Sequence, residues 1–489
     1  MPVAKPPEIF DRDREWAALA DFAADPRPEV SFGVVSGRRR QGKTYLLRSL
    51  AQLTGGFFFE AAEATEADSL RMFGAAVARY AGVSVDLPFA RWDDALAYLL
   101  DLTRDRPAPV VIDEFPFLIK ASPQLPSLLK RELDERGPSQ QAASRARVLV
   151  CGSAMSVMGR LLAGNAPLRG RASLEMVVQP FGYREAAAFW GANDPRLAVL
   201  VHSITGGTPA YRRQFVRDDA PDGPGDFDAW VVRAVLNPDR PLLREARYLL
   251  AEETDIRDPA LYHSVLAAVA AGHQRWGAIA SYVGRKTADI AHPLTVLEDA
   301  GLVAKDEDCF RSGRARYRIM EPLITFYEAI MRPRWADLEQ GMGESVWQDS
   351  RPRFLSGVVG PHFEQVCRDF ARRYGREVFG QPVGEVGAGT IADPASKSQI
   401  EVDVVVLGPA EPGVRRRVVS LGEAKWGDVM GQRHVARLRR ALALLEIKGY
   451  DTSEAILACY GGAGFDPGLR AEADRQRLLL VDLGQLYAA

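Results

Sequence analysis

Short apolar runs alternate with amphipathic stretches along the first third of the chain. The apolar runs have the length of buried strands and lie at residues 31–36, 57–60, 110–113 and 148–152. The stretches between them repeat apolar positions at helical spacing, at residues 45–53, 95–102 and 128–136. Apolar strands that alternate with amphipathic helices predict a parallel sheet covered on both faces. We therefore predict an α/β fold for a first domain at residues 1–180.

The pattern becomes mostly helical after Pro180. Residues 185–190 and 197–204 have helical spacing, and residues 218–226, rich in Asp, Pro and Gly, predict an exposed loop. We interpret residues 181–255 as a helical lid that follows the first domain.

Three helices and a hairpin are predicted next, in a domain at residues 256–335. The helices are expected at residues 261–270, 277–283 and 288–299. Pro293 is expected to kink the third helix or delay its start, and the hairpin is expected to turn at Ser312 and Gly313. This order is that of a winged helix, which often reads DNA through its third helix. Because that helix ends in two acidic residues, a structural or protein-contact role is weighed beside DNA readout.

A second α/β unit is predicted at residues 345–489, after a connection that ends near Gly357. Its helices are expected at residues 363–374 and 435–445, and its strands at residues 400–407, 418–424, 456–459 and 478–481. The chain is therefore predicted to fold as several domains in sequence.

Composition and charge narrow the classes of function. The chain has 489 residues, of which 47% are hydrophobic and 26% charged, as in ordinary globular proteins. The net charge of -2 argues against general binding of polyanions, so any contact with nucleic acid needs a local basic patch. The four cysteines form no metal-binding or disulfide spacing, which fits a reducing cytoplasm. We expect no signal peptide and no membrane contact, because no apolar stretch is long enough to span a bilayer.

Residues 37–44 fit the phosphate-binding pattern GxxxxGK[ST]. They follow an apolar strand and open a helix, which is the setting that the mechanism of this motif requires. Backbone N–H groups that face the phosphates are expected from Gly37, Arg38, Arg39, Arg40, Gln41 and Gly42. Lys43 is expected to contact the β- and γ-phosphates, and Thr44 to ligate Mg²⁺. The predicted ligands are therefore ATP and Mg²⁺.

Two further strand ends carry candidate groups for hydrolysis. Asp113 ends an apolar strand and is expected to hold Mg²⁺, while Glu114 is expected to act as general base toward water. The alternative is a strand with a solvated acidic end. Ser153 ends the next strand and is a candidate γ-phosphate sensor, or simply a small residue there. Arg169 and Arg171 are candidate arginine fingers, or solvated loop arginines.

Several motifs resemble those of the AAA+-like ATPases of the STAND/MNS branch, of the archaeal-ATPase type with a DUF234-like C-terminal domain. The matching segments are DRDRE at residues 11–15, GRRRQGKT at 37–44, CGSAMS at 151–156, PLRGR at 167–171 and GGTPAY at 206–211. The resemblance implies that Arg12 lies beside the nucleotide, and it favours Arg171 over Arg169 as the finger. Arg169 stands where the family often has Tyr. An arginine that acts in trans would require an oligomer.

The C-terminal unit carries a second group of candidate residues. Asp403 lies in one predicted strand, and Glu423 and Lys425 lie two residues apart in the next, so they point to the same face. Two carboxylates that bind Mg²⁺ and a lysine that orients water would serve phosphodiester cleavage. The pattern resembles the PD-(D/E)xK nuclease signature, with Val402 in place of Pro. Glu364 matches the helix glutamate, a third candidate metal ligand, that many such restriction-endonuclease-like folds carry.

Several alternatives remain open for this C-terminal unit. Its charges could serve solubility, or the fold could be that of a nuclease that no longer cuts. The arginines at residues 415–417 and 433–440 could contact phosphates or form a solvated surface.

Two functions follow from these patterns. The first is an ATPase that couples hydrolysis to a nuclease-like domain acting on DNA or another nucleic acid. The second is a signalling ATPase in which ATP controls assembly with a protein partner and the C-terminal domain does not cleave. A metabolic P-loop kinase is disfavoured, because the pair Asp113 and Glu114 favours hydrolysis.

Overall fold

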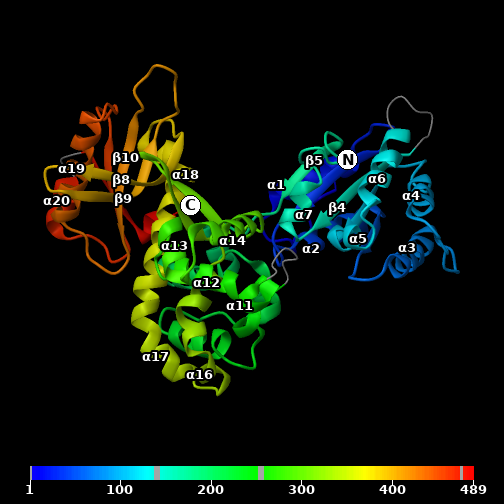
Figure 1. Ribbon diagram of the computed structural model, residues 1–489, viewed down its shortest axis with the longest axis horizontal. Coiled ribbons are helices and arrows are strands. Elements are labelled where there is room, and N and C mark those ends of the chain that lie inside the picture. Colours follow the sequence, from blue (N-terminus) through cyan, green and yellow to red (C-terminus); the bar gives the residue numbers. More distant parts are fainter. Residues whose placement is uncertain (1–2, 137–143, 252–257, 474–476, 489) are drawn as a thin grey trace. The chain divides into compact units, whose positions relative to one another are not determined.

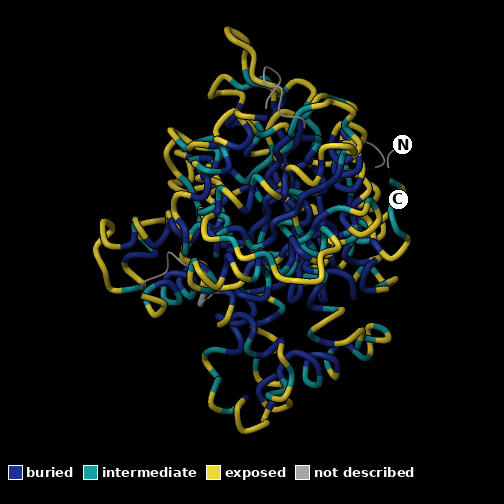
Figure 2. Tube along the Cα trace, turned by 90° about the vertical axis from the view of Figure 1, so that its right-hand side faces the viewer, coloured by how far each residue is buried: buried dark blue, intermediate teal, exposed yellow. Residues whose placement is uncertain are grey.

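The computed structural model of the protein describes residues 3–136, 144–251, 258–473 and 477–488 (Figure 1). The chain divides into two compact units, residues 1–180 and residues 181–489. Buried segments, dark blue in Figure 2, form the interior, and exposed segments, yellow, lie mostly in the outer loops. Each unit is described by itself below.

The first unit is a parallel five-stranded sheet with helices on both faces, which confirms the predicted α/β class. Its strands, in spatial order, are β2 (Phe57–Glu60), β3 (Ala108–Asp113), β4 (Ala146–Gly152), β1 (Ser31–Ser36) and β5 (Ala172–Val177). Its helices are α1 (Asp13–Ala24), α2 (Lys43–Thr54), α3 (Glu66–Ala81), α4 (Trp92–Asp101), α5 (Phe115–Ala121), α6 (Leu125–Glu135) and α7 (Met155–Arg160).

Alternate residues of the central strands enter two separate hydrophobic cores. Phe32 and Val34 of β1 pack with side chains of α3 to α6 on one face. Val35 of β1 and Leu149 of β4 pack with α1 and α2 on the other face. Because β4 lies between β1 and β3, the carboxyl ends of these three strands are neighbours at one edge of the sheet. That edge carries the candidate ATP-site residues.

Strand β5 was not predicted from the hydrophobic pattern. It lies at the edge of the sheet beside β1, and most of its residues are partly or fully exposed. An edge strand needs no continuous apolar run, because one side of it faces solvent.

The second unit begins with a helical segment and continues into a winged helix. The first segment contains α8 (Tyr183–Trp190), α9 (Pro195–Thr205), the π-helical turns η1 (Tyr211–Phe215) and η2 (Val231–Val235), α10 (Phe227–Trp230) and α11 (Pro241–Ala251). Gly207 of the GGTPAY motif lies against the backbone of Phe181, whose N–H donates to the Gly207 carbonyl over 2.9 Å. A side chain at residue 207 would collide with that backbone, which explains the glycine there.

The winged helix contains α12 (Pro259–Ala270), α13 (Trp276–Val283), α14 (Thr287–Asp299) and the hairpin β6 (Val303–Asp308) and β7 (Arg311–Ile319). Two details of the prediction were wrong. Pro293 does not delay the start of α14, which begins at Thr287 and continues through the proline. The hairpin turns at Cys309 and Phe310, and Ser312 and Gly313 lie inside β7. The turn is displaced because the ladder shifts register between Glu307 and Asp308.

No helix was predicted in the connection that ends near Gly357, but the structure contains helices there. The chain from Pro322 onward is helical: α15 (Pro322–Phe326), η3 (Tyr327–Met331), η4 (Arg332–Arg334), α16 (Trp335–Glu339), α17 (Gly343–Arg353), η5 (Phe354–Val359) and α18 (Gly360–Phe379). Val346, Trp347 and Phe354 are buried in the same core as α8 and α9. Tertiary packing therefore outweighs the unfavourable helix propensity of the Pro and Gly residues.

The C-terminal part is a mixed sheet in the order β12-β11-β10-β9-β8. Strands β8 (Glu385–Asp393), β9 (Ser398–Leu407) and β10 (Val418–Lys425) form an antiparallel meander. Helix α19 (Gln432–Ile447) then leads to β11 (Ile456–Gly461), which pairs parallel with β10. Helix α20 (Pro467–Ala473), strand β12 (Leu478–Asp482) and α21 (Leu483–Tyr487) complete the chain.

One face of this sheet packs with the helical segment, and the other packs with α19. Val404 and Val406 belong to the core that also holds residues of α8, α9 and α18. Val405 and Leu421 belong to a second core with α19. No helix among the described residues is long and apolar enough to cross a membrane.

Candidate functional site

The loop between β1 and α2 carries backbone angles that the phosphate-binding motif needs. Gly37 has φ 146°, and a Cβ there would lie 2.5 Å from the Val178 carbonyl oxygen. Arg40 and Gly42 also have positive φ, 67° and 86°. The space beside Gly42 is open. The loop thus turns into the N-terminus of α2 at the carboxyl edge of the sheet, a place where an anion can bind.

Lys43 links this loop to the neighbouring strand ends. Its ammonium donates to the Arg38 carbonyl over 2.9 Å and to Ser153 Oγ over 3.1 Å. Ser153 Oγ in turn donates to Glu114 Oε1 over 3.0 Å. Burial lowers the pKa of Lys43, although nearby carboxylates oppose the shift. One chain of hydrogen bonds therefore joins the predicted phosphate ligand, sensor and general base.

Asp113 and Glu114 are held in contrasting environments. Asp113 is buried, and its Oδ1 accepts the Glu114 N–H over 2.9 Å, whereas its Oδ2 has no hydrogen-bond partner among the described residues. Glu114 has φ 50°, which is uncommon for a residue with a side chain and is typical of functional sites. Thr44 follows Lys43 in the first turn of α2 and is half-buried. A buried carboxylate oxygen without a partner fits a cation ligand.

Arg12 lies against the phosphate-binding loop. It precedes α1, is buried, and its Nη2 donates to the Gln41 carbonyl over 3.4 Å. Burial lowers its pKa, and Glu15 opposes the shift. Arg12 therefore supports the backbone of the loop.

Arg171 is not brought to this hydrogen-bonded chain. Its Nε donates to Asp134 Oδ1 over 2.7 Å, and its side chain is 41% exposed. Arg169 donates instead to the Gly164 carbonyl over 2.6 Å. Both arginines are thus engaged away from Lys43, Ser153 and Glu114 within this unit.

The C-terminal sheet brings Asp403, Glu423 and Lys425 together. Lys425 Nζ lies 3.2 Å from Asp403 Oδ2 and 3.0 Å from Glu423 Oε1. Asp403 Oδ2 also accepts the Ala424 N–H over 3.0 Å, which pins β9 to β10 at this position. Burial alone would lower the pKa of Lys425, but the two carboxylates outweigh it and raise that pKa. Strands β9 and β10 pair, and this pairing brings the side chains of Asp403, Glu423 and Lys425 together.

Two arginines complete this cluster. Arg368 was not singled out from the sequence, and Arg437 was considered only within the arginine run at residues 433–440. Arg437 of α19 donates to Glu423 Oε1 over 3.1 Å. Arg368 of α18 donates to the Asp403 carbonyl over 2.8 Å and lies 3.8 Å from Glu364 Oε2. The only sequence signal was helical spacing, since Glu364 and Arg368 are four residues apart.

A metal ion in the cluster of Asp403, Glu423 and Lys425 would need carboxylate oxygens that are not already hydrogen-bonded. Glu423 is 1% exposed, and its Oε2 has no hydrogen-bond partner within the described part of the chain. Among the described residues, however, no three His, Cys, Asp or Glu side chains lie close enough together to hold an ion. Lys425 lies between the two carboxylates instead. Metal binding by Glu364, Asp403 and Glu423 therefore stays a prediction.

Glu364 offers a test of its own environment. Burial raises its pKa to about 7, and Asp403 adds to the rise. Between pH 4.5 and about 7, Glu364 therefore keeps its proton in the folded protein but has lost it in the unfolded chain. As the pH rises through this window, the contribution of Glu364 to the free energy of unfolding therefore falls. We expect this fall to be absent in Glu364→Gln.

Urea unfolding at a series of pH values measures the difference between wild type and Glu364→Gln. Glu377→Gln, on an exposed residue of the same helix, is the matched control. An equal pH dependence in wild type and in Glu364→Gln would contradict the expectation.

Most of the arginines that were weighed as phosphate contacts are paired within the chain. Arg416 pairs with Glu385, and Arg417 with Asp451. Arg439 and Arg440 pair with Glu472 and Asp393, and Arg437 pairs with Glu423 as described above. These pairs favour the structural interpretation of the two arginine runs.

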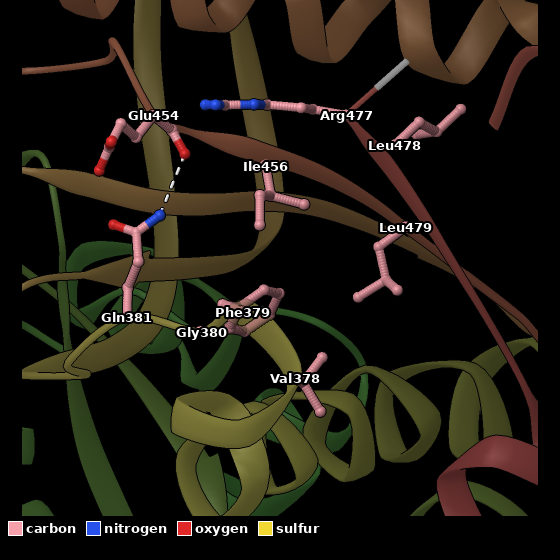
Figure 3. Close-up of a pocket in the computed structure, with 9 residues that line it drawn as sticks. All are labelled: Val378, Phe379, Gly380, Gln381, Glu454, Ile456, Arg477, Leu478 and Leu479. Atoms are coloured by element: carbon pink, nitrogen blue, oxygen red, sulfur yellow. Dashed lines mark hydrogen bonds between the residues drawn. The ribbon is translucent and has the colours of Figure 1, made fainter. Parts of the chain in front are cut away.

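A pocket of about 450 Å³ lies elsewhere on the C-terminal sheet (Figure 3). Phe379, Ile456 and Leu479 contribute apolar walls, and Gln381 donates to the Glu454 carbonyl over 3.1 Å at one side. None of the predicted site residues lines it.

Comparison with known proteins identifies the fold of the first part. No family profile matches the chain. The uncharacterized protein MJECL04 of Methanocaldococcus jannaschii is 26% identical over 372 residues, which are 74% of this chain and 77% of that protein. The Walker-type ATPase paby2304 of Pyrococcus abyssi has a TM-score of 0.52 at 18% identity and covers 67% of this chain and 98% of its own. The ORC2 protein of Aeropyrum pernix, solved as ADPNP-ADP complexes, has a TM-score of 0.42 at 14% identity. The match covers 71% of this chain and 97% of that protein. The chain therefore has the fold of a Walker-type P-loop ATPase.

Proposed function

We propose that the protein binds ATP with Mg²⁺ at residues 37–44 and hydrolyses the nucleotide. The observation that carries this proposal is the hydrogen-bonded chain from Lys43 through Ser153 to Glu114. These three side chains meet at one edge of the sheet, which supports a cation for the phosphates, a hydroxyl for the γ-phosphate and a carboxylate for water there. A fold shared with a Walker-type ATPase supports the same assignment.

Each residue of the ATP site then has a separate task. The N–H groups of the loop hold the phosphates, Lys43 turns from Ser153 to the β- and γ-phosphates, and Glu114 orients and deprotonates the attacking water. Thr44 and the partnerless Oδ2 of Asp113 would hold Mg²⁺, which supplies charge neutralisation at the phosphate oxygens. Arg12 keeps the loop in place through the Gln41 carbonyl.

Arg171 acts, in this proposal, on the nucleotide of a second copy in an oligomer. The support is its exposed position and its pairing with Asp134 rather than with the residues around Lys43. An arginine that reaches a neighbouring site can stabilise the charge that develops on the phosphates.

We divide the chain into domains at residues 1–180, 181–255, 256–335 and 345–489. The proposed target of ATP turnover is the last of these domains. There Asp403 and Glu423 would hold Mg²⁺, which activates water for phosphodiester cleavage, and Lys425 would orient that water. The buried, partnerless Oε2 of Glu423 supports a cation at this place. The four cysteines, all free, fit the reducing cytoplasm as its location.

A second function is favoured by the contacts of Lys425. Its ammonium already joins Asp403 and Glu423, so the cluster is neutralised without a metal. In that case the C-terminal domain only binds, and ATP controls assembly with a protein partner. DNA-stimulated ATP turnover would support the nuclease-coupled function. Turnover that is unchanged by DNA, together with no Mg²⁺-dependent cleavage, would leave the signalling function.

Asp403→Ala is expected to abolish any Mg²⁺-dependent cleavage of DNA or RNA by the wild type. The change removes a proposed metal ligand and the acceptor that pins β9 to Ala424. Cleavage is measured on single-stranded and duplex DNA and RNA, with and without ATP and Mg²⁺. Asp428→Ala, on an exposed residue after β10, is the matched control and should cleave as the wild type does. Cleavage that survives in Asp403→Ala would place the activity elsewhere.

A further inference from the structure

Two aromatic side chains of the winged helix face solvent although most large rings of the chain are buried. Trp276 and Tyr282, at the two ends of α13, are 43% and 51% exposed. Trp276 Nε1 donates to the Thr287 carbonyl over 2.9 Å, which fixes the indole beside the start of α14. The Tyr282 ring lies 4.9 Å from the ring of His273. Both rings are therefore held in place and still present an open side.

Exposed positive charge lies beside these rings. Arg275, Arg285 and Lys286 are exposed, and no ion pair of theirs is found within the described part of the chain. The sequence contains no Asp or Glu between Asp258 and Asp289. Asp289 lies beside this region, where its carboxylate accepts the Lys286 N–H. We call the exposed surface made by His273, Arg275, Trp276, Tyr282, Arg285 and Lys286 the α13 surface (Figure 1, helix α13).

The other parts of the winged helix are less suited to bind an anion. The hairpin is docked on the C-terminal sheet: the Cys309 N–H donates to the Ala388 carbonyl over 3.0 Å, and Arg316 Nη2 lies 2.8 Å from Glu401 Oε1. Helix α14 ends in Glu298 and Asp299. The α13 surface, in contrast, combines exposed rings with exposed cations.

We infer that the α13 surface binds single-stranded nucleic acid. Its cations contact the phosphates, and unpaired bases stack on Trp276 and Tyr282. A single strand fits better than a duplex, because the bases of a duplex are stacked on one another and are not available to these rings. The inference shares with the proposed function only the choice of nucleic acid as the partner. The residues of the α13 surface belong neither to the ATP site nor to the carboxylate cluster.

The test is binding of a labelled oligothymidylate to the full chain, followed by fluorescence anisotropy without nucleotide and without Mg²⁺. Trp276→Ala and Tyr282→Ala are each expected to weaken binding by about fivefold or more. Trp276→Phe and Tyr282→Phe keep a ring and should bind within about twofold of wild type. Tyr248→Ala, on an equally exposed tyrosine of α11, is the control for ring removal. Circular dichroism verifies that each variant is folded.

The cations are tested through the salt dependence of the same binding. Replacing both Arg285 and Lys286 with Ala should lower the slope of log K against log salt by about 0.7 for each phosphate that the two side chains neutralise. Arg376→Ala, on an exposed cation of α18, should leave the slope unchanged.

Three outcomes would overturn the inference: no binding of the oligonucleotide, wild-type binding by the alanine variants, or tighter binding of a matched duplex. ATP hydrolysis is measured separately on the same preparations. Loss of oligonucleotide binding with normal ATP hydrolysis is a failure of this surface alone. Loss of ATP hydrolysis with normal oligonucleotide binding is a failure of the proposed function alone.

Discussion

Lys43→Ala is expected to abolish ATP binding at micromolar concentrations and, with it, ATP hydrolysis. The Lys43 ammonium lies against both Ser153 and the Arg38 carbonyl, at the place where the phosphates are expected. A hydrogen bond to a charged group contributes about 1.5–3 kcal/mol. Loss of the interactions with two phosphates therefore predicts binding that is weaker by about a hundredfold or more.

Binding of a fluorescent ATP analogue and release of phosphate measure the two effects. Lys120→Ala removes a lysine that pairs with Glu63 on the surface of the same unit, and it should leave both unchanged. If Lys43→Ala binds the nucleotide as the wild type does, residues 37–44 are not the nucleotide site.

Glu114→Gln is expected to bind ATP as tightly as the wild type but to hydrolyse it about 10²–10⁴-fold more slowly. A glutamine can still accept the Ser153 hydroxyl, so the hydrogen-bonded chain and the φ of 50° should survive. The amide cannot take a proton from water, and positioned general bases contribute about this factor. Separate measurements of binding and single-turnover hydrolysis distinguish the two effects.

The control for this change is Glu175→Gln, on an exposed residue of β5 in the same unit. It should hydrolyse ATP at the wild-type rate. Normal hydrolysis by Glu114→Gln would show that another group, or water alone, receives the proton.

The arrangement of the candidate ATP-site residues could be predicted from the sequence because it depends on local order. A glycine-rich turn between an apolar strand and a helix specifies its own geometry, and apolar strands that end in Asp113 and Ser153 meet at one edge of any parallel sheet. The pairing of Lys43 with Ser153 follows only from the strand order, in which β4 separates β1 from β3. Spacing along the chain does not determine that order.

The meeting of Asp403, Glu423 and Lys425 in the C-terminal sheet could also be predicted from local order along the chain. Alternation places Glu423 and Lys425 on one side of β10, and antiparallel pairing of consecutive strands is the commonest arrangement. The roles of Arg368 and Arg437 could not be predicted, because each depends on which face of a helix packs against the sheet. The docking of the hairpin on β8 likewise depends on contacts between distant parts of the chain.

The missed helices between Trp335 and Gly357 have a different cause. Their sequence contains Pro352 and three glycines, at residues 341, 343 and 357, and both residue types disfavour a helix. Burial of Trp347 and Phe354 in a shared core stabilises the helical state of the whole segment. Propensity alone therefore gave the wrong answer where packing decided.

That shared core limits how this protein can be rearranged by gene fusion. Side chains of α8 and α9 complete the same apolar interior as α18 and one face of the C-terminal sheet, and Tyr183 and Arg184 of α8 both donate to the Leu486 carbonyl near the end of the chain. A gene segment that encodes only residues 345–489 would lack the side chains of α8 and α9 that share a core with Phe363 and Trp426. The unit of inheritance is therefore expected to be residues 181–489 as a whole, so that recombination would exchange this unit entire or not at all.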